Sequence, residues 1–290
     1  MPKLYYIFGL SARSDFELPE LVEITERERG ERGLETIEIV SNSIPSELPD
    51  MLRVTPFMQA GEHVCLYDFA SIARFLVEDG RKITVQMYPD GQFGDMRTVL
   101  LGEVMGTLLH MRRLVPLHVS AVVTPDGLVA FGGPSGAGKS TTAAQLYRKH
   151  GWKIFCDDVA VLDPEIEAPL LHSGITRLKL WRGVIHRLGF DDEDLQRDFS
   201  KIEKYHILCD EIFFSDPCVL SRLFILKQRD TQITPSRITG REAVTSLLNL
   251  VHRPISAKLF NDRALISSCI CNLCKKIEVW DFYSSPSATN

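Results

Sequence analysis

The residues with the clearest chemical meaning lie at positions 133–140, which read GPSGAGKS. This segment fits the pattern G-x-x-x-x-G-K-[ST], whose backbone N–H groups surround a polyphosphate. Gly136 and Gly138 readily adopt backbone angles that other residues resist, so successive N–H groups can turn inward. Lys139 is placed to reach the β- and γ-phosphates, and the Ser140 hydroxyl is placed to bind Mg²⁺. The segment therefore predicts a polyphosphate site.

Two adjacent carboxylates form the second chemical feature. Asp157 and Asp158 follow Lys139 by eighteen and nineteen residues (157 − 139 and 158 − 139) and interrupt an apolar run over residues 153–163. Burying two acids in such a run is costly unless they serve a cation or a proton. Mg²⁺ coordination plus a general base is the simplest assignment, and a strand-end turn with solvated acids is the alternative. Because neighbouring side chains on a strand point to opposite faces, the two aspartates need not share a role.

Three other side chains are candidates for the same site. A lone histidine such as His118 is more often a core residue than a catalytic one, but antiparallel pairing would bring it beside the phosphate end of the sheet. Arg177 and Lys179 are candidates for contacts with phosphate or with an acidic substrate. Plain surface charge is an equally good interpretation of these two residues.

A strand and a helix must position the phosphate loop. Leu128–Phe131 is a short apolar run typical of a strand, and residues 140–150 predict a helix that stops at Gly151. Residues 117–123 and a turn at residues 124–127 make that strand the second arm of an antiparallel hairpin. The sheet is therefore expected to be mixed, unlike the parallel sheet of a βαβ unit.

Residues 1–94 predict a β-rich α+β domain without a chemical motif, a candidate platform for peptide recognition. Strands are expected at residues 3–10 and 35–40, and a hairpin over residues 73–87 with Asp79-Gly80 at its turn. The charge run at residues 25–32 is expected to be a solvated loop or hairpin tip.

We expect residues 95–283 to form a second domain, which carries the phosphate loop, and residues 284–290 to form a disordered tail. Thr239 to Glu242 reads as a capping box that opens a helix. Further helices are expected at residues 95–112 and 263–275, strands at 153–163, 173–181, 220–226 and 277–283, and a mobile loop or short helix at 190–204.

Composition restricts the class of protein. The chain has 290 residues, 44% of them hydrophobic and 24% charged, which suits an ordinary globular core. A net charge of −5 argues against a nucleic-acid binder. No apolar run reaches the ~18 residues that span a membrane, and the N-terminus is expected to form a strand rather than a signal peptide.

Cysteine usage favours a reducing compartment, and we expect a cytoplasmic protein. Seven cysteines are an odd number in a chain of this length. Cys269, Cys271 and Cys274 form the one cluster, which lacks a fourth zinc ligand nearby. Buried thiols on a helix face are favoured over a zinc site.

This ordered set of motifs resembles the catalytic domain of the HPr kinase/phosphorylase family. The resemblance rests on a histidine that opens a strand, fifteen residues before Gly133 (133 − 118), a hairpin into the phosphate loop, and an aspartate pair on the next strand. Residues 7–21, 100–110 and 114–122 are also similar to the HPr-kinase-like proteins found with lasso peptide biosynthesis, which phosphorylate a serine of the precursor peptide.

The resemblance implies an α/β fold: a P-loop kinase of the HPr kinase/PEP carboxykinase-like type with a mixed sheet, preceded by the β-rich domain. It implies transfer of phosphate from ATP, with Mg²⁺, to a serine of a peptide or small protein. Asp158 would take the proton of the acceptor, His118 would pair with Asp158, and Asp157 would help Ser140 hold the metal. The triphosphate would contact Gly133, Pro134, Ser135, Gly136, Ala137, Gly138, Lys139, Ser140 and Thr141.

Two other functions are compatible with these residues. One is a kinase of a small alcohol or amino acid, and the other is a nucleotide-sensing module whose slow hydrolysis switches a partner. The paired aspartates favour a kinase, because a switch needs metal binding but no acceptor base. The resemblance also leaves a homo-oligomer open.

Overall fold

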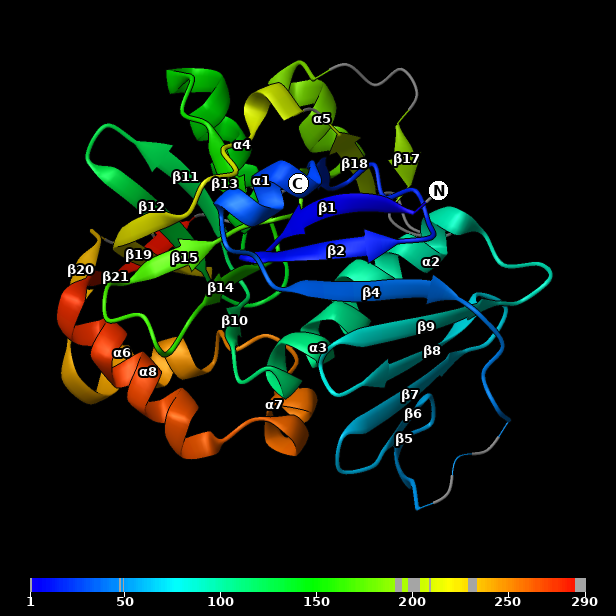
Figure 1. Cartoon of the computed structure of the whole chain (residues 1–290). Coiled ribbons are helices and arrows are strands. Elements are labelled where there is room, and N and C mark those ends of the chain that lie inside the picture. Colours follow the sequence, from blue (N-terminus) through cyan, green and yellow to red (C-terminus); the bar gives the residue numbers. More distant parts are fainter. Residues whose placement is uncertain are drawn as a thin grey trace. The chain divides into compact units, whose positions relative to one another are not determined.

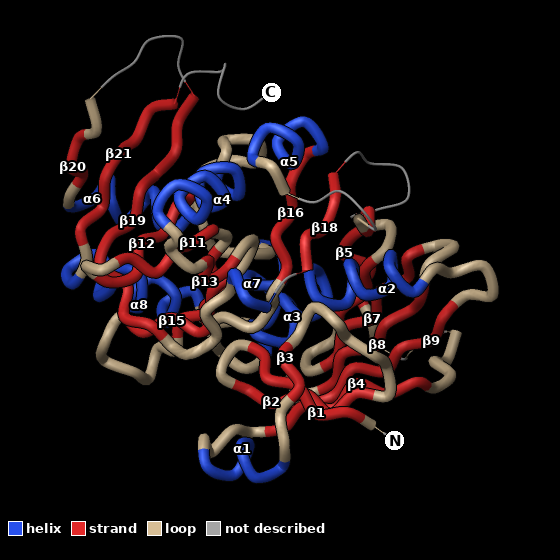
Figure 2. The backbone as a smooth tube through the Cα atoms, turned by 90° about the horizontal axis from the view of Figure 1, so that it is seen from above, coloured by secondary structure: helices blue, strands red, loops and turns tan. Residues whose placement is uncertain are grey.

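The computed structural model describes residues 2–46, 48, 50–190, 195–197, 204–208, 210–228 and 234–284. Within these residues the chain is a mixed α/β protein with two nine-stranded sheets and one three-stranded sheet (Figures 1 and 2). It forms two compact units, Met1–Leu114 with Arg253–Arg263, and Val115–His252 with Ala264–Asn290. Each unit is described by itself.

The first unit contains a nine-stranded sheet of order β3-β1-β2-β4-β9-β8-β7-β6-β5. Its strands are β1 (Lys3–Ile7), β2 (Leu10–Ser14), β3 (Val22–Glu23), β4 (Thr36–Ser41), β5 (Leu52–Thr55), β6 (Met58–Ala60), β7 (Val64–Phe69), β8 (Ala73–Glu78) and β9 (Lys82–Met87). The predicted hairpin of β8 and β9 is confirmed, and Asp79 and Gly80 at its turn have φ angles of 51° and 62°. Positive φ at both central residues fits the tight turn closed by the hydrogen bond from the Arg81 N–H to the Glu78 carbonyl oxygen, within a three-residue loop between the paired Glu78 and Lys82.

A helical segment follows these strands. It consists of α2 (Phe93–Val99), a π-helical stretch (Leu100–Val104) and α3 (Met105–Met111), and α3 packs against α7 (Pro254–Phe260). The predicted helix over residues 95–112 is confirmed, apart from the π-helical stretch. Because this helix packs on β8, the first unit extends to Leu114, beyond the boundary expected at residue 94.

The charged segment at residues 25–32 is a helix, and the expectation of a loop or hairpin tip was wrong. Helix α1 (Glu26–Glu31) begins with a complete capping box between Thr25 and Glu28. The Glu28 N–H donates to Thr25 Oγ1 at 3.2 Å, and the Thr25 N–H donates to Glu28 Oε2 at 2.7 Å. The helix buries no residue, so hydrophobic periodicity could not reveal it.

The second unit contains the phosphate-loop segment. Its strands are β10 (Val115–Leu117), β11 (Ser120–Thr124), β12 (Gly127–Gly132), β13 (Ile154–Cys156), β14 (Ala160–Leu162), β15 (Leu170–His172), β16 (Arg177–Trp181), β17 (Gln196–Arg197), β18 (Lys204–Leu208), β19 (Cys218–Gln228), β20 (Ser236–Ile238) and β21 (Glu278–Ser284). Its helices are α4 (Lys139–His150), α5 (Arg182–Leu188), α6 (Gly240–Leu248), α8 (Arg263–Lys276) and a 3₁₀ turn (Asp210–Ile212).

The larger sheet of this unit is mixed, as expected from the hairpin. Strand β12 pairs antiparallel with β11 on one side and parallel with β19 on the other. Strands β16, β17 and β18 form the separate three-stranded sheet. None of the helices that the structure describes has the length and apolar character needed to cross a lipid bilayer.

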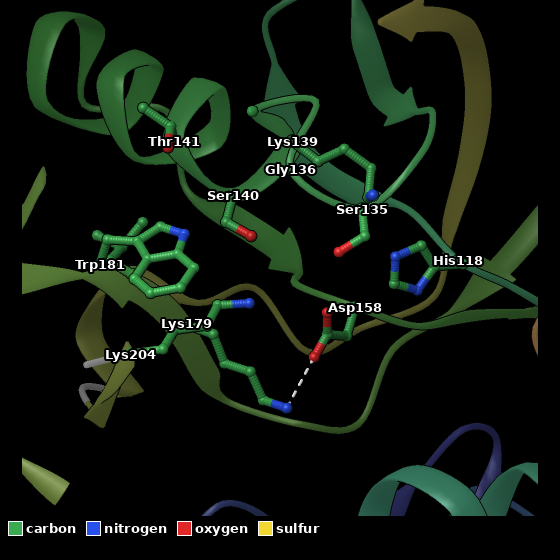
Figure 3. A pocket seen from close by; sticks show the side chains of 12 residues that line it. His118, Ser135, Gly136, Lys139, Ser140, Thr141, Asp158, Lys179, Trp181 and Lys204 are labelled. Atoms are coloured by element: carbon green, nitrogen blue, oxygen red, sulfur yellow. Dashed lines mark ion pairs between the residues drawn. The ribbon is translucent and has the colours of Figure 1, made fainter. Parts of the chain in front are cut away.

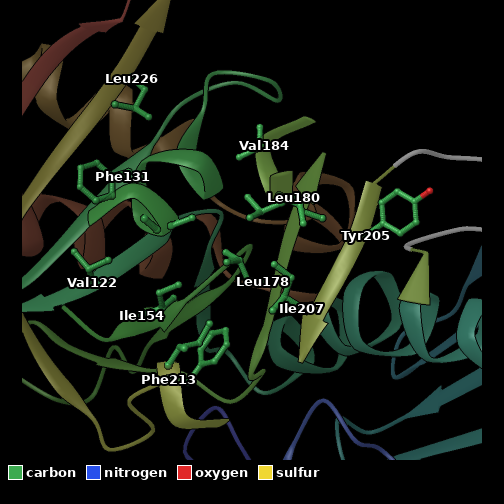
Figure 4. Packing of buried hydrophobic residues seen from close by; sticks show 14 of the residues in the cluster. Val122, Phe131, Ile154, Leu178, Leu180, Val184, Tyr205, Ile207, Phe213 and Leu226 are labelled. Atoms are coloured by element: carbon green, nitrogen blue, oxygen red, sulfur yellow. The ribbon is translucent and has the colours of Figure 1, made fainter. Parts of the chain in front are cut away.

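One hydrophobic cluster holds the elements that build the candidate site (Figure 4). It joins Phe131 of β12, Ala143 of α4, Ile154 of β13 and Leu178 of β16, together with the buried side chains Val122, Leu180, Val184, Ile185 and Leu226. Burial of apolar surface is the main favourable term in such packing. The cluster therefore fixes the phosphate loop, the strand before the aspartates and β16 relative to one another.

Several predicted elements differ from the structure. The run over residues 153–163 is two strands, because the chain turns at Asp158, whose φ angle is 83°. The strand expected from residue 173 begins at Arg177. Helix α6 follows Thr239, but no side-chain hydrogen bond caps it, so the predicted capping box does not form.

Two other expectations fall largely or wholly on residues without a description. The loop or short helix expected at residues 190–204 is described only at residues 190, 195–197 and 204. Within the tail expected over residues 284–290, residues 285–290 lie outside the described residues. The helix at 263–275 and the strands at 220–226 and 277–283 are confirmed by α8, β19 and β21.

Candidate active site

The phosphate-loop segment connects β12 to α4 through backbone conformations that glycine allows. Gly133, Gly136 and Gly138 have φ angles of 137°, 80° and 94°. A Cβ atom added at Gly133 would lie 2.6 Å from the carbonyl oxygen of Leu226, so a side chain there would displace the backbone of β19. The loop thus leads directly into the N-terminus of α4, an arrangement that favours anions.

Lys139 lies inside this loop and is only 6% exposed. Its ammonium group donates hydrogen bonds to the carbonyl oxygens of Gly133 at 2.9 Å and Pro134 at 3.1 Å. Burial lowers the pKa of Lys139, although the carboxylates of Asp158 and Asp157 act in the opposite direction. The Lys139 side chain thus lies inside the loop, where the pattern expects phosphate oxygens.

A cavity of about 570 Å³, including its mouth open to solvent, lies beside the loop (Figure 3). The residues that line it come from the loop, α4, β16, β18 and the segments after β10 and β13. They are His118, Ser135, Gly136, Gly138, Lys139, Ser140, Thr141, Asp158, Lys179, Leu180, Trp181 and Lys204. The structure thus brings together most of the site residues predicted from the sequence.

Asp158 projects into this cavity from the turn after β13. Its carboxylate forms an ion pair with Lys179, with Oδ2 and Nζ 3.0 Å apart (Figure 3). Burial raises the pKa of Asp158, but Lys179, Lys204 and His118 together lower it further, so the net pKa lies well below the usual range. Asp158 is therefore an ionised hydrogen-bond acceptor at physiological pH.

Asp157 has different surroundings and is not among the residues lining the cavity. It is 3% exposed. Its Oδ1 accepts a hydrogen bond from Ser120 Oγ at 2.5 Å, and its Oδ2 accepts one from the Lys179 N–H at 2.9 Å. Burial and the charge of Asp158 raise the pKa of Asp157. These contacts tie β11 to β16, and the metal-binding role expected for Asp157 stays a prediction that they do not support.

His118 stacks on a second histidine that the sequence did not indicate. The rings of His118 and His252 are 5.7 Å apart between centroids and nearly parallel, at 5°. The His118 N–H donates to the Leu250 carbonyl oxygen at 2.6 Å, and the His252 N–H donates to the Pro116 carbonyl oxygen at 2.9 Å. These backbone contacts between distant segments hold the two rings beside each other.

The wall opposite the loop comes from β16 and β18. Their antiparallel register places Trp181 opposite Lys204 and Lys179 opposite His206. Arg177, the other cation predicted for this site, is 2% exposed and is not among the lining residues. Lys204 was not predicted as a site residue from the sequence, because it lies far along the chain from the other lining residues. Trp181 was not predicted either, although the alternation of side chains along β16 could have placed it on the same face as Lys179.

No family model matches the sequence, and no curated protein matches it. Among solved structures, the chain is similar to one described as "Structure of the Hpr(Ser) kinase/phosphatase from Coxiella burnetii", with a TM-score of 0.32 and 12% identity. The match covers 59% of this chain and 85% of that chain. A TM-score this low carries no argument about the site.

The donor set in the cavity fits Mg²⁺ bound together with a triphosphate. Ser140 offers a hydroxyl ligand, and the remaining positions would be filled by phosphate oxygens and by the waters that Mg²⁺ usually keeps. The structure, as far as it describes the chain, contains no cluster of three or more His, Cys, Asp or Glu residues arranged to hold a metal. Burial raises the pKa of Cys269 and Cys274, which lie on α8, to about 11.

Proposed function

We propose that this cavity binds ATP with Mg²⁺ and transfers the γ-phosphate to a hydroxyl group, that of a serine in a peptide or small protein. The observation that supports this most strongly is the presence of Lys139, Ser140 and Asp158 along one cavity. The loop and the hydroxyl account for nucleotide and metal. An ionised carboxylate beside them is what transfer to a hydroxyl requires in addition.

In the proposed step, the oxygen of the acceptor hydroxyl forms a bond to the γ-phosphorus as the bond to the β,γ-bridging oxygen breaks. The hydroxyl proton passes to Asp158, and ADP leaves with the bridging oxygen. Mg²⁺, when bound, would neutralise charge on the β- and γ-phosphate oxygens. Lys139 and the loop N–H groups would hold the remaining phosphate charge.

A carboxylate with a low pKa is suited to this reaction. Phosphoryl transfer passes through a loose transition state in most analyses, so the acceptor oxygen gains little charge and keeps its proton until late. Asp158 then acts chiefly by accepting a hydrogen bond from the hydroxyl and orienting it. Lys179 holds the carboxylate at 3.0 Å and so limits its motion before the acceptor arrives.

The acceptor we propose is a serine of a lasso peptide precursor. The support for it is the similarity of residues 7–21, 100–110 and 114–122 to kinases of that group. The β-rich part of the first unit would then serve as the platform for the peptide. A kinase of a small alcohol or amino acid would use the same chemistry with a different acceptor.

Acceptor-dependent consumption of ATP tests the proposal. Purified protein is incubated with ATP and Mg²⁺ alone, with a serine peptide, with the same peptide carrying alanine, and with a panel of small alcohols. The proposal predicts a phosphorylated serine peptide and little turnover without it. Lys139→Met should abolish transfer, whereas Lys149→Met, on the exposed end of the same helix, should not.

If no acceptor increases the turnover of ATP, the proposed kinase activity would be contradicted. Tight ATP binding with slow hydrolysis and no phosphorylated acceptor would identify a nucleotide-sensing module instead. Phosphorylation of a small alcohol in preference to the serine peptide would keep the chemistry and overturn the proposed acceptor.

A further inference from the structure

Trp181 is an exposed aromatic residue on the rim of the cavity that phosphate chemistry does not require. It ends β16, is 51% exposed and lines the cavity with Lys179 and Lys204. Leu178 and Leu180 of the same strand are buried in the core, so alternation puts Lys179 and Trp181 on the opposite face. A single exposed aromatic side chain is unremarkable on its own. Its position on the rim of the cavity makes it a candidate ligand contact.

The cavity has two distinguishable ends. His118 lies at one end, close to Asp158 and Ser135, and Trp181 lies at the other, on the side of Ser140 and Thr141 (Figure 3). Transfer to a hydroxyl oriented by Asp158 requires the γ-phosphate at the first end. The α-phosphate, the ribose and the base would then extend past Ser140 and Thr141 towards the second end.

The backbone that carries Trp181 is well anchored. The residue joins β16 directly to α5, whose Val184 and Ile185 are buried in the same cluster as the apolar residues of β16. Its cross-strand partner, Lys204, adds a positive charge beside it. The indole ring is thus presented from a fixed strand end, which lowers the entropic cost of using it as a binding surface.

We propose that Trp181 stacks on the nucleobase of the bound nucleotide. The inference rests on the proposed function of the phosphate loop and adds the residue that recognises the nucleoside. Stacking needs only the π-face that every base offers, so Trp181 would favour nucleotides over bare polyphosphate with little choice among bases.

The test compares ATP with inorganic tripolyphosphate, which offers the same phosphates without a base. Dissociation constants are measured by calorimetry for the wild type, Trp181→Ala, Trp181→Phe and Phe93→Ala. Phe93 is 59% exposed on α2 and controls for loss of an exposed aromatic ring elsewhere. Trp181→Ala should weaken ATP binding by about 5- to 150-fold and leave tripolyphosphate unchanged. Trp181→Phe should recover most of the affinity, and Phe93→Ala should match the wild type.

The possible results separate this inference from the proposed function. Equal weakening of both ligands in Trp181→Ala, or no weakening of either, would overturn stacking while the phosphate site stands. Failure of tripolyphosphate and ATP to bind the wild type would overturn the phosphate site and the inference with it. Quenching of indole fluorescence by ATP, but not by tripolyphosphate, that disappears in Trp181→Phe would support stacking directly.

Discussion

Replacing Asp157 and Asp158 separately by asparagine tests the different roles that their contacts give them. Asparagine removes the charge and keeps the size of the side chain. In Asp158→Asn the acceptor loses the group that would take its proton, which contributes about 10²–10⁴-fold to such reactions. We expect kcat to fall by that factor. ATP affinity should not fall, because the change removes a negative charge from the proposed nucleotide cavity and leaves the cation of Lys179 in place.

Asp157→Asn should behave differently because its hydrogen bonds survive the change. The amide oxygen can accept from the Lys179 N–H, and the amide group can donate to the Ser120 hydroxyl, which rotates to accept. Two charge-assisted bonds become neutral ones, but the change also removes a charge that burial and Asp158 disfavour, so the unfolding free energy should change by no more than about 1–2 kcal/mol. A loss of less than about tenfold in kcat is expected.

Asp157→Ala completes the series, because it leaves the Ser120 hydroxyl and the Lys179 N–H without their acceptor. A buried polar group without a partner costs about 1–3 kcal/mol, so the two together should lower the unfolding free energy by about 2–6 kcal/mol. Urea unfolding measures this loss, and phosphate transfer at saturating ATP across a Mg²⁺ titration measures kcat. A hundredfold loss of kcat in Asp157→Asn with a raised Mg²⁺ requirement would refute the reasoning and make Asp157 a metal ligand.

Three further outcomes follow from the loop and its cations. Urea unfolding should show Gly133→Ala as more destabilised than Gly136→Ala, since the added Cβ meets a backbone oxygen at 2.6 Å in the first case and no atom within 4 Å in the second. As pH rises, calorimetry should show the affinity for tripolyphosphate falling below pH 10.5, the ordinary pKa of lysine, because burial lowers the pKa of Lys139 and the neutral amine no longer attracts phosphate. In Lys139→Arg the side chain stays charged, so the affinity should not fall in this range. Lys179→Met removes a charge that lowers the pKa of Asp158, so kcat should begin to fall at a higher pH on acidification than in the wild type. Equal loss of unfolding free energy in the two glycine variants would contradict the first argument, and the same pH dependence of affinity in Lys139→Arg as in the wild type would contradict the second. An unchanged pH dependence of kcat in Lys179→Met would contradict the third.

Features set by local sequence were the ones that could be predicted. The glycine-rich loop at residues 133–138 with its flanking strand and helix, the hairpin before it, and the hairpin at Asp79-Gly80 depend on residues close together in the chain. Helix α1 was also local, but its only signal was the cap between Thr25 and Glu28, since it buries no residue. The same kind of pattern misled at Thr239, where no side-chain cap forms.

The parts of the site that escaped prediction depend on tertiary structure. His252 reaches His118 through backbone contacts between distant segments, and Lys204 reaches the cavity through pairing of β16 with β18. The turn at Asp158 requires a positive φ angle, and no glycine or proline next to Asp158 indicates a turn there. This turn separates the two carboxylates: Asp158 lines the cavity, and Asp157 joins two strands.

Phosphoserine formation with γ-labelled ATP tests the central claim most directly. The label is followed into a serine peptide with wild-type protein, Asp158→Asn and Lys139→Met under identical Mg²⁺ concentrations. The account predicts label on the serine with the wild type, about 10²–10⁴-fold slower transfer with Asp158→Asn, and none with Lys139→Met. Transfer that continues undiminished in Asp158→Asn, or label that appears only as free phosphate with the wild type, would contradict it.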